Sequence, residues 1–336
     1  MKRIRFLARI VALAGITSGT AHSGVLQGSW SNGAPMPVAN NGAGSATISG
    51  LTYVVGGCAD WACNSPLQAT LAYNAGSDTW TPESDMPTAR GNFGVAVAGG
   101  LLYAMGGVTS SSSWTSANEA YNPSSNSWAA LAPVPTARYG PAAVTGSNGL
   151  IYLFGGNGGS GPLSLVEAYN PSTDSWTCSK GDTAPGCAAQ SLAPIPEGSE
   201  GGAAFAAKST IYLVVGASAP GHLSGDVLAY SVKTGKWKKH PVTSVPTPRY
   251  FFGAAFTTGK AGMLYVIGGA SAPGGSVLSS ANEAYSFKTK SWTTEAPLPT
   301  AVVGPASAVT TKRAIQIAGG ADANQNSTAL NQLFTP

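Results

Sequence analysis

The sequence predicts an all-β fold built from repeats, and three observations support this prediction. Charged residues make up only 10% of the 336 residues, whereas 44 glycines and 23 prolines separate short apolar segments. This mixture is typical of β-strands joined by many turns. Beyond the first two dozen residues the chain has no amphipathic helical stretch. Aromatic and glycine landmarks also recur at a nearly constant spacing, which indicates a repeat architecture.

Each repeat has four landmarks in a fixed order. A Pro-x-x-x motif comes first, at 37–40, 87–90, 135–138, 196–199, 246–249 and 299–302. An apolar strand that ends in two glycines, or nearly so, follows at 51–57, 101–107, 150–156, 211–217, 264–269 and 314–320. A tyrosine and, seven residues later, a tryptophan come last: Tyr73/Trp80, Tyr121/Trp128, Tyr169/Trp176, Tyr230/Trp237 and Tyr285/Trp292. In the sixth repeat Phe334 stands where the tyrosine is expected.

These landmarks resemble the kelch repeat, from about residue 24 to the C-terminus. The resemblance implies a six-bladed kelch-type β-propeller with four antiparallel strands per blade, stacked because one sheet cannot bury both of its faces alone. Trp30 has no glycine strand before it, and the last repeat has no tryptophan strand, so we expect residues 25–30 to close the ring. The expected blades are about 40–80, 90–128, 138–176, 199–237, 249–292, and 302–336 plus 24–30.

The first 23 residues have the pattern of a signal peptide. Four basic residues precede a short apolar run at 10–16, and small residues stand at 21 and 23, before a cleavage site at Gly24. A buried N-terminal helix is the alternative interpretation. The apolar run is too short to span a bilayer, and no later segment is long enough. We therefore predict a secreted or periplasmic protein with no transmembrane segment after cleavage.

Charge and cysteine content narrow the possible partners. Without residues 1–23 the chain has 14 basic and 14 acidic residues, which gives no basis for binding nucleic acid. The four cysteines suggest disulfides in an exported protein, and of three possible pairings proximity favours Cys58 with Cys63 and Cys178 with Cys187. Neither pair has neighbouring histidines, so we expect no metal site and no cofactor. We expect a monomer.

The kelch resemblance places candidate ligand-binding residues at the fourth position of the Pro-x-x-x motif, at one mouth of the central pocket. Arg90, Arg138 and Arg249 occupy it in three repeats, and Asn40, Ser199 and Val302 in the others. Guanidinium groups bind carboxylates in a bidentate manner, so such a mouth predicts an acidic or hydroxyl-rich ligand. The next residues, Tyr139 and Tyr250, join the predicted site. The alternative is that these arginines only form hydrogen bonds with the backbone or carboxylates of the neighbouring blade.

Other residues complete the candidate site. Glu197 and Glu200 flank the same position in the fourth repeat, whereas Glu119, Glu167 and Glu283 recur before the tyrosines and are predicted to be structural, pairing with lysines. Trp61 and Trp114 lie outside the repeat register, in loops that either contact a partner or pack a small core of their own.

Two functions remain open. The first is a non-catalytic module that recognises a glycan or a protein at an arginine-lined mouth. The second is a sugar-active isomerase, because the sequence is similar to periplasmic sialic acid mutarotases, which are six-bladed kelch propellers. Glu200 or Glu197 would then supply the general acid or base.

Overall fold

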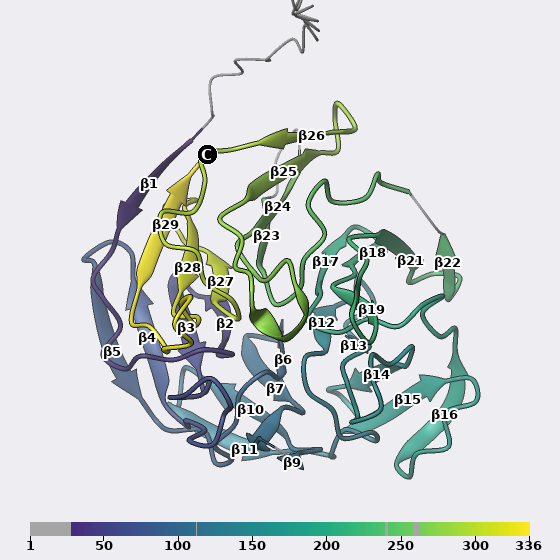
Figure 1. The fold of residues 1–336 in the computed structure, drawn as a ribbon. Coiled ribbons are helices and arrows are strands. Elements are labelled where there is room, and N and C mark those ends of the chain that lie inside the picture. Colours follow the sequence, from purple (N-terminus) through teal and green to yellow (C-terminus); the bar gives the residue numbers. More distant parts are fainter. Residues whose placement is uncertain (1–27, 112, 239–240, 258–261) are drawn as a thin grey trace, which may run out of the picture.

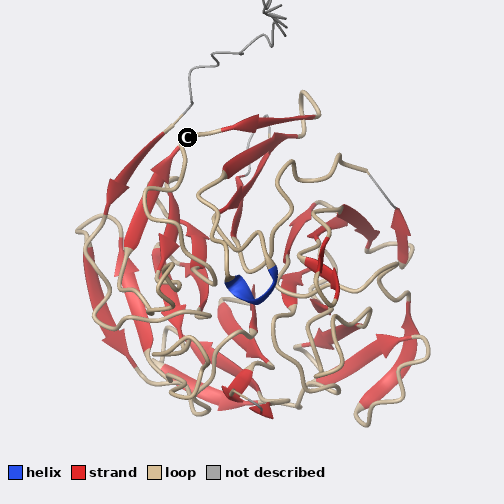
Figure 2. Cartoon of the chain, viewed as in Figure 1, coloured by secondary structure: helices blue, strands red, loops and turns tan. Residues whose placement is uncertain are grey.

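The computed structural model describes residues 28–336 except residues 112, 239–240 and 258–261. Six antiparallel sheets stand around a central axis (Figure 1), and strands and loops make up nearly all of the described chain (Figure 2). The predicted fold class, a six-bladed β-propeller with four antiparallel strands per blade, is confirmed. The predicted signal peptide, residues 1–23, lies outside the described residues.

Within each blade the strands follow one another from the axis to the rim. The four-stranded sheets of blades 1–5 and of the closing blade 6 have these bounds: β2(Gly44–Ile48), β3(Leu51–Val55), β4(Thr70–Asn74) and β5(Thr79–Glu83) in blade 1; β6(Gly94–Ala98), β7(Leu101–Met105), β10(Asn118–Asn122) and β11(Ser127–Ala130) in blade 2; β12(Ala142–Thr145), β13(Ile151–Phe154), β14(Val166–Asn170) and β15(Ser175–Ser179) in blade 3; β17(Ala203–Ala207), β18(Thr210–Val214), β21(Val227–Ser231) and β22(Lys236–Lys238) in blade 4; β23(Gly253–Thr257), β24(Met263–Ile267), β25(Asn282–Ser286) and β26(Ser291–Thr294) in blade 5; β27(Ala306–Val309), β28(Ile315–Ala318), β29(Asn331–Thr335) and β1(Ser29–Asn32) in blade 6.

The two ends of the described chain close the ring, as predicted. Strand β1 pairs antiparallel with β29, with Trp30 opposite Phe334. Their ring centroids lie 5.1 Å apart, so Phe334 takes the place of the usual tyrosine in the aromatic pair. The closure leaves blade 6 with the same four-stranded order as the other blades.

The repeated tryptophans tie each blade to the connector that leads into it. In all six blades the indole N–H donates a hydrogen bond of 2.8–3.1 Å to a backbone carbonyl of that connector. The ring itself packs on the tyrosine or phenylalanine of the neighbouring strand. A large apolar ring with one polar atom suits this position, because the ring is partly buried while its N–H finds a partner.

The double glycines join neighbouring blades. At five junctions the second glycine donates its N–H, over 2.7–2.9 Å, to the carbonyl of the residue that follows the next blade's Pro-x-x: Arg90, Arg138, Ser199, Val302 and Asn40. A Cβ on Gly106, at φ +70°, would lie 2.7 Å from the Arg138 carbonyl oxygen, so the close approach requires glycine here. Blades 4 and 5 also contact each other through stacked aromatic rings on their innermost strands, with the Phe205 and Phe256 centroids 4.6 Å apart.

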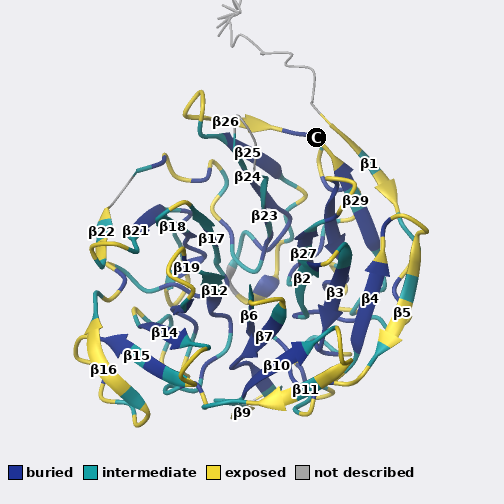
Figure 3. Cartoon of the chain, turned by 180° about the vertical axis from the view of Figure 1, so that it is seen from behind, coloured by how far each residue is buried: buried dark blue, intermediate teal, exposed yellow. Residues whose placement is uncertain are grey.

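The second and third strands of the blades are mostly buried, the innermost strands are partly buried, and the outermost strands are largely exposed (Figure 3). The structure also differs from the expected four strands in one blade: β16(Cys187–Leu192) extends blade 3 in parallel with β15, and the Cys178–Cys187 disulfide holds it there. Two small hairpins and one 3-10 turn occur in the loops: β8(Val108–Ser110) with β9(Ser113–Trp114), β19(Ala217–Ala219) with β20(His222–Leu223), and η1(Pro273–Gly275). Nowhere in the described part of the chain is there an apolar helix of membrane-spanning length.

Candidate functional site

The three repeated arginines, predicted to bind ligand, lie buried inside the blades and do not line the mouth. Arg90, Arg138 and Arg249 are at most 1% exposed. Each guanidinium pairs with the glutamate of the third strand in its own blade: Arg90 with Glu119 at 3.0 Å, Arg138 with Glu167 at 2.5 Å and Arg249 with Glu283 at 2.5 Å. The glutamates are structural, as predicted, but their partners are these arginines and not lysines.

Backbone carbonyls take up further arginine donors. Arg90 donates to the Ala104 carbonyl over 3.0 Å, and Arg138 to the Gly155 carbonyl, also over 3.0 Å. Burial lowers the pKa of Arg90 to about 10 despite the opposing effect of Glu119. Asn40, at the same repeat position in blade 1 and also predicted to bind ligand, is buried as well and does not line the mouth. The side chain at this position lies inside the blade and not on the axis.

The residue after this position lines the mouth instead. Asn41, Tyr139, Glu200, Tyr250 and Val303 are five of these next residues, and they lie around one cavity of about 250 Å³. Trp61, Asn92, Phe251, Gly274 and Gly304 complete its lining. We call this cavity the cup. Four residues predicted from the sequence therefore line one cavity: Tyr139, Tyr250, Glu200 and Trp61. The repeated arginines do not line it and are buried inside the blades.

A ring of backbone hydrogen bonds encircles the central channel at the base of the cup. The residue two positions after the Pro-x-x-x motif donates its N–H to the carbonyl of the equivalent residue in the preceding blade, over 2.7–2.9 Å, all the way around. All six have φ between +47° and +64°, where glycine is favoured. The six residues are Gly42, Asn92, Gly140, Gly201, Phe251 and Gly304.

Phe251 is the exception in this ring of small residues. A bulky side chain at φ +47° is strained, at a cost of order 1–3 kcal/mol. Its ring reaches from blade 5 toward blade 3, because a Cβ on Gly140 would lie 3.1 Å from the Phe251 Cζ atom. The phenyl ring therefore packs against Gly201 and Gly140 and forms part of the floor of the cup. Phe251 is not one of the repeat landmarks, so nothing in the sequence marks it as a site residue.

Glu200 is the charged residue of the cup. It is 9% exposed, and a backbone pair with Ala217 fixes its main chain, with both N–H to O distances at 2.9 Å. The Asn157 amide donates to its Oε2 over 2.8 Å. Burial and then the neighbouring Glu200 carboxylate raise the pKa of Tyr139 to about 12, so this phenol remains protonated and is a hydrogen-bond donor. The carboxylate is thus held in one orientation from two sides.

Tyr250 and Trp61 form another part of the wall. The Tyr250 hydroxyl accepts a hydrogen bond of 3.0 Å from the Gly275 N–H, and burial raises the pKa of this phenol. Trp61 packs on the Gly275 backbone from the loop between Cys58 and Cys63. That disulfide is formed, as predicted. The Asp60 carboxylate accepts from the Asn64 and Ser65 N–H groups at 3.0 and 2.7 Å, which fixes the loop that carries Trp61.

Trp114 supports the cup without lining it. Its ring lies 5.8 Å from the Tyr139 ring and packs on Gly159. Of the two loop tryptophans, Trp61 therefore contacts the cavity and Trp114 backs one of its walls. Glu197, the other carboxylate named from the sequence, is half-buried and does not line the cup. Its proposed catalytic role loses support from this geometry.

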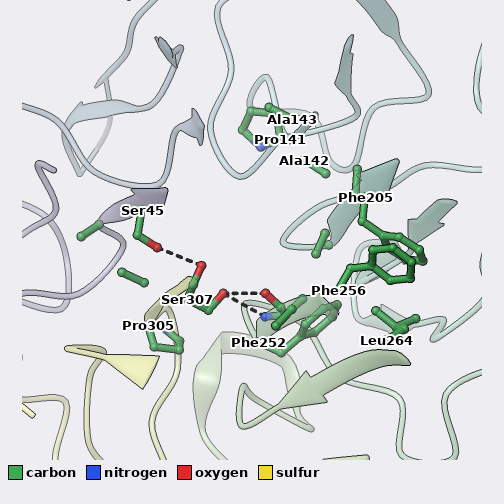
Figure 4. A pocket seen from close by; sticks show the side chains of 17 residues that line it. Ser45, Pro141, Ala142, Ala143, Phe205, Phe252, Phe256, Leu264, Pro305 and Ser307 are labelled. Atoms are coloured by element: carbon green, nitrogen blue, oxygen red, sulfur yellow. Dashed lines mark hydrogen bonds between the residues drawn. The ribbon is translucent and has the colours of Figure 1, made fainter. Parts of the chain in front are cut away.

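Below the ring the central channel changes character. A second cavity of about 220 Å³ is lined mainly by alanine, proline and phenylalanine side chains (Figure 4). Its polar groups bond one another: Ser45 Oγ donates to the Ser307 carbonyl over 2.9 Å, and Ser307 Oγ contacts the Ala254 backbone. No charged side chain lines this inner channel among the described residues. The polar groups available to a ligand are concentrated in the cup.

The described residues offer one cluster with metal-ligand chemistry, Cys178, Asp182 and Cys187. Its two cysteines form a disulfide, as predicted, so their sulfurs are not thiolate ligands. The cup contains a single carboxylate and none of its lining residues is a histidine or cysteine. Its donor set therefore suits hydrogen bonding and aromatic contact with an organic ligand.

The fold, the repeat landmarks and the central cup define a kelch-repeat β-propeller. A family model of the Kelch motif matches residues 39–87, and that of the Attractin/LZTR1 beta-propeller matches residues 102–335. Since the second match spans well over half of the sequence, the chain belongs to the Attractin/LZTR1 β-propeller family. No curated protein matches the chain.

Among solved structures the chain is similar to the one titled "Structure of YjhT", with a TM-score of 0.71 and 18% sequence identity. The match covers 90% of this chain and 96% of the other. At this identity the likeness shows a shared fold, and the ligand has to be argued from the cup.

Proposed function

We propose that this chain is an exported binding module that holds a sugar ring of a glycan in the cup. The carrying observation is the lining of the cup: aromatic rings of Trp61, Tyr139, Tyr250 and Phe251 beside the fixed carboxylate of Glu200. Aromatic rings cover the apolar face of a sugar, and carboxylate and phenol groups bond its hydroxyls. The two disulfides support export, because disulfides persist in oxidising compartments.

The size and charge of the cup narrow the ligand. Its volume of about 250 Å³ lies just below the roughly 300–1,000 Å³ of sites for drug-sized ligands, which favours a single ring over a longer oligomer. The arginines that an acidic sugar would require are buried and neutralised within the blades. We therefore propose a ligand without a carboxylate.

Calorimetric titration of the chain with glucose, N-acetylglucosamine and glucuronic acid tests the proposal. Tyr139→Phe removes the hydroxyl beside Glu200, and Tyr169→Phe is the matched control, because its hydroxyl donates to the Asp174 carboxylate in the same blade over 2.7 Å, outside the cup. One lost hydrogen bond is worth about 0.5–1.5 kcal/mol, so we expect binding about two- to tenfold weaker in the first variant and unchanged in the control. If no sugar binds to the folded chain, a protein partner replaces the glycan in this proposal.

Catalysis on the same sugar is the second candidate, and one observation favours it. The Glu200 carboxylate and the Tyr139 phenol are adjacent in an enclosed site, and anomer interconversion needs a proton acceptor and a proton donor near the ring oxygen. Exchange spectroscopy on a bound sugar measures the rate of anomerisation. We expect Glu200→Gln to abolish any acceleration over buffer, and a wild type that gives no acceleration would leave binding as the function.

A further inference from the structure

The electrostatic field in the cup comes from one side chain. Among the residues that line it, Glu200 alone carries a charge. The three nearest repeat arginines are each paired with a glutamate inside a blade, so they do not offset it. On the rim, the Asp60 carboxylate beside Trp61 adds a second negative charge, and its backbone hydrogen bonds lower its pKa. The mouth therefore attracts cations.

The walls around Glu200 suit a cation as well. Four aromatic side chains line the same cavity: Trp61, Tyr139, Tyr250 and Phe251. The face of an aromatic ring attracts an ammonium group, and this attraction strengthens where water is excluded. A sugar with only hydroxyl groups would gain from the apolar faces of these rings but not from their quadrupoles.

The Glu200 carboxylate retains acceptor capacity for a ligand. A carboxylate offers about four lone-pair positions, and the Asn157 amide and the Tyr139 hydroxyl account for two of them. An ammonium group has three donors and no acceptor, so it complements the remaining lone pairs. Hydrogen bonds between opposite charges are about twice as strong as neutral ones.

From these three features we propose that the cup selects a sugar that bears a free amino group. The inference rests on the proposed glycan-binding function and names the chemical class of the ligand. The ammonium group lies against the Glu200 carboxylate within the four aromatic side chains, and the sugar ring covers the Phe251 floor. Acetylation of the amine removes both the charge and two of the donors, so the acetylated sugar binds like a neutral one.

The test compares glucosamine, N-acetylglucosamine, glucose and tetramethylammonium by calorimetry at about pH 6, where amines are protonated. We expect glucosamine to bind at least about tenfold more tightly than glucose, and tetramethylammonium to compete with it. Glu200→Gln is nearly isosteric and is expected to bring glucosamine and glucose within about threefold of each other, while glucose still binds. Asn326→Asp, which adds a carboxylate at a rim position bridged to Asp60, serves as a control for general negative charge and is expected to raise that ratio by much less than Glu200→Gln lowers it.

A measurement on the wild type alone guards against variants that fail to fold. Salt screens attraction between charges, so raising the salt concentration is expected to weaken glucosamine binding and to leave glucose binding unchanged. Equal affinities for glucosamine and glucose, with no salt dependence, overturn the amino-sugar inference and leave the glycan proposal standing. Binding of none of the sugars overturns the glycan proposal and this inference with it.

Discussion

Removing Arg138 and Glu167 together is expected to destabilise the propeller far less than removing either residue alone. Both side chains are fully buried, and their charged atoms lie 2.5 Å apart. Arg138 also donates to the Thr136 and Gly155 carbonyls, at 2.9 and 3.0 Å. Breaking a buried pair from one side typically costs about 3–5 kcal/mol, because an uncompensated charge remains.

The two single variants should differ in size. Glu167→Leu leaves a guanidinium that cannot release its proton, so we expect the full loss of about 3–5 kcal/mol. Arg138→Met leaves a carboxyl that takes up a proton when buried, and we expect a smaller loss. The double variant replaces the pair by apolar side chains of similar volume, which is often neutral or stabilising. Blade 4 shows that leucine fits, since Leu228 stands at the Glu167 position and is buried.

Equilibrium urea unfolding of the wild type and the three variants gives the coupling energy directly. We expect the double variant to lose at least about 2 kcal/mol less stability than the sum of the two single losses. Losses that simply add would refute the reasoning, because they would mean that neither charge depends on the other in the folded blade. This interpretation requires that the variants change the urea concentration at the unfolding midpoint but not the dependence of the unfolding free energy on urea concentration.

Three further predictions follow from the buried pair and the cup. Burial raises the pKa of Glu167 from 4.5 to about 7, so the folded chain takes up a proton between these pH values and its stability falls as the pH rises through this range. Urea unfolding should show the free energy of unfolding of the wild type falling by up to about 3 kcal/mol relative to Glu167→Gln across this range. A difference between the two proteins that does not change with pH would contradict the shift. Phe251→Gly relieves a strained backbone but removes the floor of the cup, so thermal unfolding should change by no more than about 1 kcal/mol while calorimetry shows weakened sugar binding; unchanged binding would place the ligand elsewhere. Replacing both Cys58 and Cys63 by alanine frees the loop that carries Trp61 and should weaken sugar binding several-fold. Removing the Cys178–Cys187 disulfide of blade 3 should leave sugar binding unchanged. Equal effects of the two changes would argue against a role for the Trp61 loop.

The repeat made the scaffold predictable. The nearly constant register of the tryptophans and their neighbouring landmarks resembles the kelch repeat, and that resemblance implied stacked blades. The unpaired Trp30 at one end matched the missing strand at the other, so closure followed from counting. The disulfides followed because each cysteine had one near neighbour. The parallel strand β16 was not foreseen, since no landmark marks it and a disulfide at the rim defines its place.

The composition of the repeats also held a clue to the arginines. Blades 2, 3 and 5 carry both an arginine after Pro-x-x and a glutamate before Ala-Tyr, whereas blades 1, 4 and 6 carry neither. Such joint presence and absence indicates partners within a blade, because a buried charge is stable only beside its counterion. Reading the two positions together would have removed the arginines from the predicted ligand site.

Sequence by itself determined the number of blades, the closing strand and the disulfide pairs, because each depends on spacing along the chain. Only the tertiary structure decided which of two adjacent residues faces the axis: Arg138 turns into its blade, and Tyr139 turns into the cup. The difference depends on left-handed backbone at the following position, where Gly140 continues the hydrogen-bonded ring. Only the assembled ring of blades shows that Phe251 of blade 5 packs against Gly140 of blade 3, since residues from different blades meet there without any fixed separation in sequence.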